Sequence, residues 1–104
     1  MNIEELVRKA DTFNREEIKK YKSDIEFLYK ISLNAGIRLA KEYKADENIV
    51  RIALAMMDSK LPEASYLKTP KEHINMSLEA TKVFLKHENS LTEDEKDKII
   101  KCVK

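Results

Sequence analysis

The sequence predicts an all-α protein, a compact orthogonal bundle of five to six helices, and three observations carry that prediction. The 104 residues include one glycine, two prolines and no tryptophan, whereas strand-rich proteins need turn glycines and period-two runs of β-branched residues. Helix-capping residues recur along the chain. Apolar residues follow these caps at helical spacing. At this length the whole chain, residues 1–104, is expected to form one domain with a modest core.

Five expected helix starts carry a capping residue. Side chains of asparagine, serine, threonine and aspartate accept hydrogen bonds from N–H groups of the first turn, and a glutamate three residues later can return the bond in a capping box. The boxes are Asn2 with Glu5, Ser23 with Glu26, Thr69 with Glu72, and Thr92 with Glu95. Asp46 opens the remaining helix without a box. Each signal agrees in register with the apolar periodicity, so each predicts a helix start.

The first two expected helices span residues 2–22 and about 24–43. The first has apolar residues at helical spacing, but the polar residues 14–17 predict a kink or a division in it. The second carries one apolar stripe, made of Phe27, Leu28, Ile31, Ala35, Leu39 and Ala40. Gly36 interrupts this helix at a cost of roughly 1 kcal/mol relative to alanine. A close helix crossing is the expected compensation.

Three further helices are expected at about 47–57, at 70–87 and from 92 onward. The first of these is apolar almost all round, which is typical of a central helix covered on several sides. The other two have apolar residues on one face. These are Ile74, Leu78, Thr81, Phe84 and Leu85 in one helix, and Ile99, Ile100 and Val103 in the other.

An irregular stretch is expected at residues 59–68, between the third and fourth helices. Pro62 keeps this stretch from continuing the helix before it. Leu61, Tyr66 and Leu67 are its apolar residues, and we expect them to pin it to the core.

The charge balance and the single cysteine limit the partners and the compartment. The 20 basic and 19 acidic residues nearly cancel, which argues against a nucleic-acid partner held by bulk positive charge. The longest apolar run, residues 52–57, is too short to cross a bilayer, so no membrane partner is expected. The N-terminal residues do not resemble a signal peptide. A lone Cys102 excludes an internal disulfide and fits a reducing cytosol, so we expect a cytoplasmic protein.

The order of the segments after about residue 24 resembles the HD superfamily, the fold of metal-dependent phosphohydrolases. "LNAGIRLAKEYKADENIVRIALAMMDSK" is similar to the family's front half, in which a small-residue helix, a turn with an acid and an apolar helix lead to a His-Asp doublet. "HINMSLEATKVFL" is similar to a later segment, in which a histidine opens a helix. The resemblance implies an HD-like part over about 24–104, preceded by an N-terminal helix, 2–22.

The resemblance implies a metal site at Asp58 and His73. Asp58 falls on the aspartate of the doublet, and His73 on a histidine that some subfamilies use as a ligand. It further implies a divalent metal (Mn²⁺, Mg²⁺ or Fe²⁺) and, in an active protein, a phosphorylated small molecule or nucleotide as substrate. However, Met57 replaces the doublet's histidine, and residues 28–31 include no first histidine. A thioether is a poor ligand for hard cations.

Because most ligands are missing, weak or no activity is expected of this chain, and whether it is an enzyme stays open. One hypothesis is an HD-like, phosphohydrolase-related domain with an incomplete metal site. One form of this hypothesis makes the chain a fragment of a longer protein that bears the family's last aspartate. A second is a non-catalytic helical module that binds a protein or a ligand. A third is a homo-oligomer, in which an uncovered last helix pairs with another copy. Asp58 as a plain helix-terminal carboxylate and His73 as a surface histidine also stay open.

Overall fold

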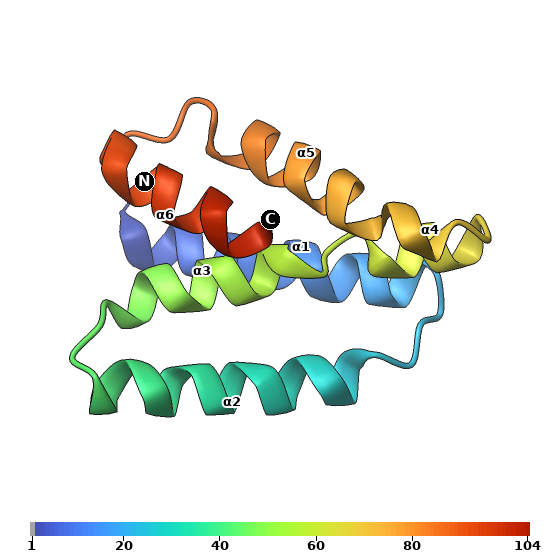
Figure 1. Ribbon diagram of the computed structural model, residues 1–104, viewed down its shortest axis with the longest axis horizontal. Helices are drawn as coiled ribbons and strands as arrows, with labels where there is room; N and C mark the ends of the chain where they lie inside the picture. Colours follow the sequence, from blue (N-terminus) through green and yellow to red (C-terminus); the bar gives the residue numbers. More distant parts are fainter. Residues whose placement is uncertain (1) are drawn as a thin grey trace.

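The computed structural model describes residues 2–104 and is a small helical bundle (Figure 1). Over these residues the elements are α1 (Ile3–Lys20), α2 (Glu26–Glu42), α3 (Glu47–Met57), α4 (Leu61–Tyr66), the 3₁₀ turn η1 (Pro70–Glu72), α5 (His73–Leu85) and α6 (Glu93–Val103). No strand occurs in this part of the chain, so the predicted all-α class is confirmed. None of the helices within residues 2–104 combines the length and the apolar character needed to cross a bilayer.

Helix α3 is the central element of the bundle. It packs against α1, α2, α5 and α6, and its Ile52 and Met56 are completely buried. Asp46 caps its first turn by accepting hydrogen bonds from the backbone N–H groups of Asn48 and Ile49, at 2.9 and 3.3 Å. The expectation of a central helix at 47–57 is therefore confirmed.

Helix α1 runs without interruption, so the predicted kink or division at residues 14–17 is wrong. Asn14 and Glu17 are buried polar residues that find partners on other helices. The Asn14 side-chain amide donates to the carbonyl of Ala55 at 2.7 Å, and Lys60 donates to the Glu17 carboxylate at 2.5 Å. Asn14 and Glu17 thus face the bundle, where each makes a hydrogen bond to another helix, so their polarity requires no break in α1. The Asn14 Oδ1 atom is itself buried without a partner.

The predicted caps at Asn2, Asp46 and Thr92 are confirmed, whereas those at Ser23 and Thr69 are wrong. Helix α2 begins at Glu26 without a side-chain cap, and η1 separates Thr69 from α5. The reason is that both residues end the preceding helix. Their backbone N–H groups donate to Ile18 and Ala64 carbonyls, at 2.9 and 2.8 Å respectively.

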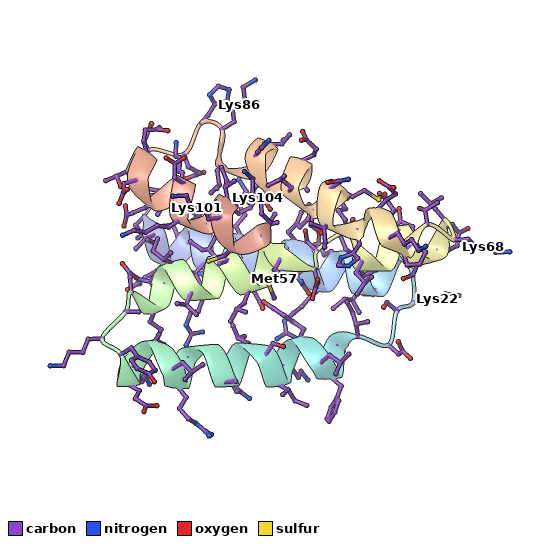
Figure 2. All side chains as sticks on the ribbon, viewed as in Figure 1. Lys22, Met57, Lys68, Lys86, Lys101 and Lys104 are labelled. Atoms are coloured by element: carbon purple, nitrogen blue, oxygen red, sulfur yellow. The ribbon has the colours of Figure 1, made fainter. Side chains whose placement is uncertain are left out.

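These helix ends are Schellman motifs, in which a residue with positive φ closes the last turn. Three lysines take that position, Lys22, Lys44 and Lys68, with φ of 50°, 56° and 61°. In each motif the lysine N–H donates three residues back, and the next residue's N–H donates five residues back. Figure 2 shows Lys22 and Lys68 at two of the connecting loops. Lysine therefore stands where glycine is the favoured residue.

Replacing Lys22 by glycine is expected to raise the free energy of unfolding by about 1 kcal/mol. The left-handed conformation costs a residue with a Cβ roughly 1–2 kcal/mol, and the greater freedom of glycine in the unfolded chain offsets part of that gain. Lys19→Gly, inside α1, is the matched control and is expected to lower stability by about 1 kcal/mol. Urea denaturation of both variants measures the two changes. Equal effects of the two substitutions would contradict the left-handed conformation of Lys22.

Residues 59–68 are not irregular, because α4 forms within them. Pro62 lies in the first turn of α4, where no N–H is needed. The buried residues are Pro62 and Ala64, whereas Tyr66 and Leu67 are 68% and 56% exposed and Leu61 is half-buried. The expectation that Tyr66 and Leu67 pin this segment to the core is therefore wrong.

Most of the apolar stripe of α2 faces solvent, and of its members only Ala40 is buried. Phe27, Leu28, Ile31 and Leu39 are each at least half exposed, and α2 lies along the outer edge of the bundle beside α3 (Figure 1). Its other face packs on α3. There a Cβ on Gly36 would overlap Leu54 Cδ1 and lie 3.2 Å from Val50 Cγ1, so the expected close crossing is confirmed.

Helix α5 differs from expectation in its bounds, and α6 differs in its burial. Helix α5 begins at His73 and ends at Leu85, a shorter range than the predicted 70–87. Helix α6 packs on α3 and α5, and its Ile99 and Val103 are buried. The predicted uncovered last helix is therefore wrong, whereas α2 does carry an uncovered apolar face.

Candidate functional site

The end of α3 and the start of α5 bring Asp58 and His73 together. Asp58 is the C-cap residue of α3, and His73 is the first residue of α5. The Asp58 Oδ1 and His73 Nδ1 atoms are 3.6 Å apart. This separation is too long for a hydrogen bond, although a protonated His73 would form an ion pair across it. The structure thus juxtaposes the two residues that the HD resemblance singles out.

His73 and Asp58 are unequally exposed. The His73 side chain is 25% exposed, and its Nδ1 atom is buried without a hydrogen-bond partner. The Asp58 side chain is 46% exposed, so water solvates much of the carboxylate. A pair this exposed contributes little to stability.

The residues around Asp58 do not fit a divalent cation. Within residues 2–104, no cluster of three or more His, Cys, Asp or Glu side chains could hold a metal ion. Figure 2 shows Met57 at the end of α3, where the doublet's histidine would stand. One carboxylate and one imidazole are too few ligands for Mg²⁺ or Mn²⁺, which bind through several oxygen ligands in octahedral geometry. No hydrolytic step can therefore be derived from this donor set.

A small cavity of about 60 Å³ lies beside Asp58, and residues of α2 form part of its lining. Leu28 and Tyr29 line it together with Met57 and Asp58. Of the four residues at which the resemblance would place a first histidine, 28–31, the first two therefore line the same cavity as Asp58. Their side chains are apolar, basic or phenolic, so they add no ligand for a hard cation.

A groove of about 530 Å³ lies along residues 76–84 of α5, and we call it the α5 groove. It is lined by Phe13 of α1, Lys60 and Glu63 near α4, and Met76, Glu79, Ala80, Val83 and Phe84 of α5. The rings of Phe13 and Phe84 are 6.5 Å apart. Val83 at its edge is 74% exposed, so the groove is open along one side.

Sequence reasoning missed the α5 groove, although a signal for it exists. Met76, Ala80 and Val83 follow one another at spacings of four and three residues, which places them on one helix face. This face lies beside the one predicted from Ile74, Leu78 and Leu85. Two adjacent apolar faces on one helix indicate that the helix has more apolar surface than the core alone requires.

Two polar interactions tie α1 to α4 at one rim of the groove. Lys60 Nζ donates to Glu17 Oε1 and lies 5.3 Å from the centre of the Phe13 ring. The Tyr21 hydroxyl donates to Glu63 Oε1 at 2.9 Å. These bonds hold charged groups at the rim in fixed positions, and the apolar floor stays uncovered.

A second polar network joins α1 to the start of α2. The Tyr29 hydroxyl donates to Asp11 Oδ1 at 2.7 Å, and Arg15 Nε donates to Asp11 Oδ2 at 2.9 Å. Arg15 also donates to Glu26 at 3.1 Å. Burial, together with the bond to Asp11, raises the pKa of the Tyr29 phenol above its ordinary value of 10.0. The bond to Asp11 raises the pKa of the Arg15 guanidinium.

The raised pKa of Tyr29 predicts a loss of stability in alkali. The folded protein keeps a phenolic proton that the unfolded chain releases above about pH 10, so the stabilisation is complete below that pH and falls as pH rises further. Above about pH 10, Tyr29→Phe is expected to make the fall of the free energy of unfolding with pH shallower by about 1.4 kcal/mol per pH unit. Urea denaturation between about pH 9 and pH 12 measures the slope. The exposed Tyr43 provides the control: a slope that falls equally in Tyr43→Phe would contradict the assignment.

Comparison of the chain with protein-family models, with curated proteins and with solved structures finds no match.

Proposed function

We propose that the protein is a non-catalytic helical binding module whose α5 groove receives apolar side chains of a partner protein. The observation that carries the proposal is the groove itself, about 530 Å³ with Phe13, Met76, Ala80 and Phe84 in its lining. Ligand sites in proteins are typically 300–1,000 Å³ and mostly apolar. The donor set at Asp58 supports no comparable chemistry.

The shape of the groove favours a protein over a small molecule. A small ligand is usually buried over most of its surface, whereas Val83 leaves one edge of this groove open to solvent. A helix lying along α5 could insert apolar side chains and cover the open edge at the same time. Lys60, Glu63 and Glu79 border the apolar floor, as polar rims border the centres of protein interfaces.

An apolar fluorescent dye, anilinonaphthalene sulfonate, tests whether the groove binds. In ¹H–¹⁵N NMR spectra, saturable shifts are expected in residues 76–84. Ala80→Lys places a charge on the groove floor and is expected to abolish them, whereas Asn75→Lys, at an exposed position on the same helix, is expected to leave them unchanged. A peptide helix with leucines at i, i+4 and i+7 is expected to displace the dye. Shifts confined to other helices, or unaffected by Ala80→Lys, would overturn the proposal.

A second candidate is an HD-like, phosphohydrolase-related domain with an incomplete metal site. Two observations favour it: Asp58 and His73 meet at 3.6 Å, and Leu28 of α2 lines the same cavity as Asp58. Substrate in that case would be a phosphorylated small molecule or a nucleotide. The two ligands present predict weak metal binding and weak or no turnover.

Metal analysis and phosphatase assays test this second candidate. Purified protein is supplied with Mn²⁺ or Mg²⁺ and assayed on nucleotides and on p-nitrophenyl phosphate. Bound metal that both Asp58→Ala and His73→Ala remove would support the candidate. Metal-free protein without turnover would exclude it and leave the binding module unaffected.

A further inference from the structure

Helix α2 carries an apolar surface that no other part of the described chain covers, which we call the α2 stripe. It consists of Phe27, Leu28, Ile31, Ala35, Leu39 and Tyr43. The exposed fractions of the large side chains run from 50% for Ile31 to 74% for Tyr43. Soluble monomers seldom leave a continuous apolar patch of this kind exposed without a function.

The spacing within the α2 stripe is symmetric. Phe27, Ile31, Ala35, Leu39 and Tyr43 follow one another at intervals of four residues, with Ala35 at the centre. If a second copy is laid antiparallel with its Ala35 on the first, Ile31 faces Leu39 and Phe27 faces Tyr43. The same residues then form both halves of the contact, as a two-fold axis requires.

We propose that the protein forms a homodimer through the α2 stripe, with the two-fold axis passing beside Ala35. Ridges of residues four apart interdigitate in the commonest class of helix packing. The small Ala35 side chain at the crossing point lets two helices approach closely. Antiparallel α2 helices also place each helix N-terminus near the partner's C-terminus, where the helix dipoles attract.

The exposed area of the α2 stripe is sufficient for a specific dimer. Six apolar side chains, each presenting on the order of 100 Å², give roughly 600 Å² per chain. Two copies would then bury about 1,200 Å², at the lower limit of specific interfaces. The net charge of +1 adds little repulsion between copies. A reversible dimer is therefore expected, with a dissociation constant on the order of micromolar.

Sedimentation velocity over a concentration series of the full chain tests the dimer. The wild type is expected to pass from monomer to dimer as concentration rises. Ile31→Glu and Leu39→Glu each place two charges in the contact and are expected to weaken dimerisation at least roughly tenfold. Leu67→Glu, at a position that is 56% exposed after α4, is the matched control and is expected to dimerise like the wild type. A wild type that stays monomeric overturns the proposal, as does a dimer that Leu67→Glu alone disrupts.

Cross-linking tests the position of the axis and needs no disruptive substitution. Ala35→Cys, in a Cys102→Ser background, is expected to be joined to its partner by a short bismaleimide. Glu42→Cys in the same background is expected to stay unlinked, because seven residues on each side of the axis separate the two sulfurs by about 20 Å. Cross-links at both positions indicate parallel helices, and cross-links at neither exclude the contact. Both outcomes overturn the proposed axis, whereas dye binding in the α5 groove is independent of this result.

Discussion

Ile52→Ala is expected to lower the free energy of unfolding by about 3 kcal/mol. Ile52 is completely buried on α3, the helix that four other helices cover. Removing its branched side chain loses the transfer free energy of the deleted carbons and leaves a cavity that a close-packed interior closes only partly. Urea denaturation of dilute protein, followed by circular dichroism, measures the change.

The control for Ile52→Ala is Phe27→Ala, which removes a larger side chain. Sequence periodicity assigns both residues to apolar helix faces, but Phe27 is 71% exposed. Phe27→Ala is therefore expected to change stability by less than about 0.5 kcal/mol in the dilute monomer, as is usual for surface positions. A loss above about 2 kcal/mol for Phe27→Ala would mean that α2 turns this face toward the core.

Lys60→Ala is expected to lower the free energy of unfolding by about 3 kcal/mol. Lys60 donates to Glu17 Oε1 at 2.5 Å, and their side chains are only 21% and 10% exposed. Removing the ammonium leaves the Glu17 carboxylate buried without its partner, which is far more costly than losing an exposed ion pair. The substitution also removes the ammonium group that lies 5.3 Å from the centre of the Phe13 ring.

Two further variants separate burial of charge from simple loss of an ion pair. Lys82→Ala breaks the exposed pair with Glu79 and is expected to change stability by less than about 0.5 kcal/mol. The double variant Glu17→Leu with Lys60→Met replaces both charges by apolar groups and is expected to lie within about 1 kcal/mol of the wild type. If Glu17→Leu fails to restore stability, the unpaired carboxylate is not the cause of the loss.

The central helix could be predicted from the sequence because its signals lie within the segment itself. Residues 47–57 are apolar on nearly all sides of the helix, and Asp46 needs only the next three residues to form its cap. The failed caps at Ser23 and Thr69 show the limit of such signals. Each residue had two possible uses, opening one helix or closing the previous one, and the lysine-closed Schellman motifs decided the outcome.

The missed features depend on residues far apart in the chain. Asn14 and Glu17 are buried without a break in α1 because each makes a hydrogen bond to a partner 41 or 43 residues away. Helical periodicity shows that α2 has an apolar face but not what covers it, so it cannot show that Phe27 and Ile31 face solvent. At the candidate site, Asp58 and His73, the residues of the expected metal site, lie next to each other, whereas the α5 groove is formed by Phe13 and α5 together.

The one-sided attachment of α2 sets the order in which the bundle comes apart. Because α2 contributes only Tyr29 to the buried core cluster and otherwise packs on α3, closely at Gly36, it can detach while Leu6, Ile52, Leu85 and Ile99 still enclose one another. Its amide protons should accordingly exchange with deuterium through a low-energy partial opening, well before those of α3. Any partner seated on the outer side of this helix would slow that exchange and so extend cooperative unfolding to the whole chain.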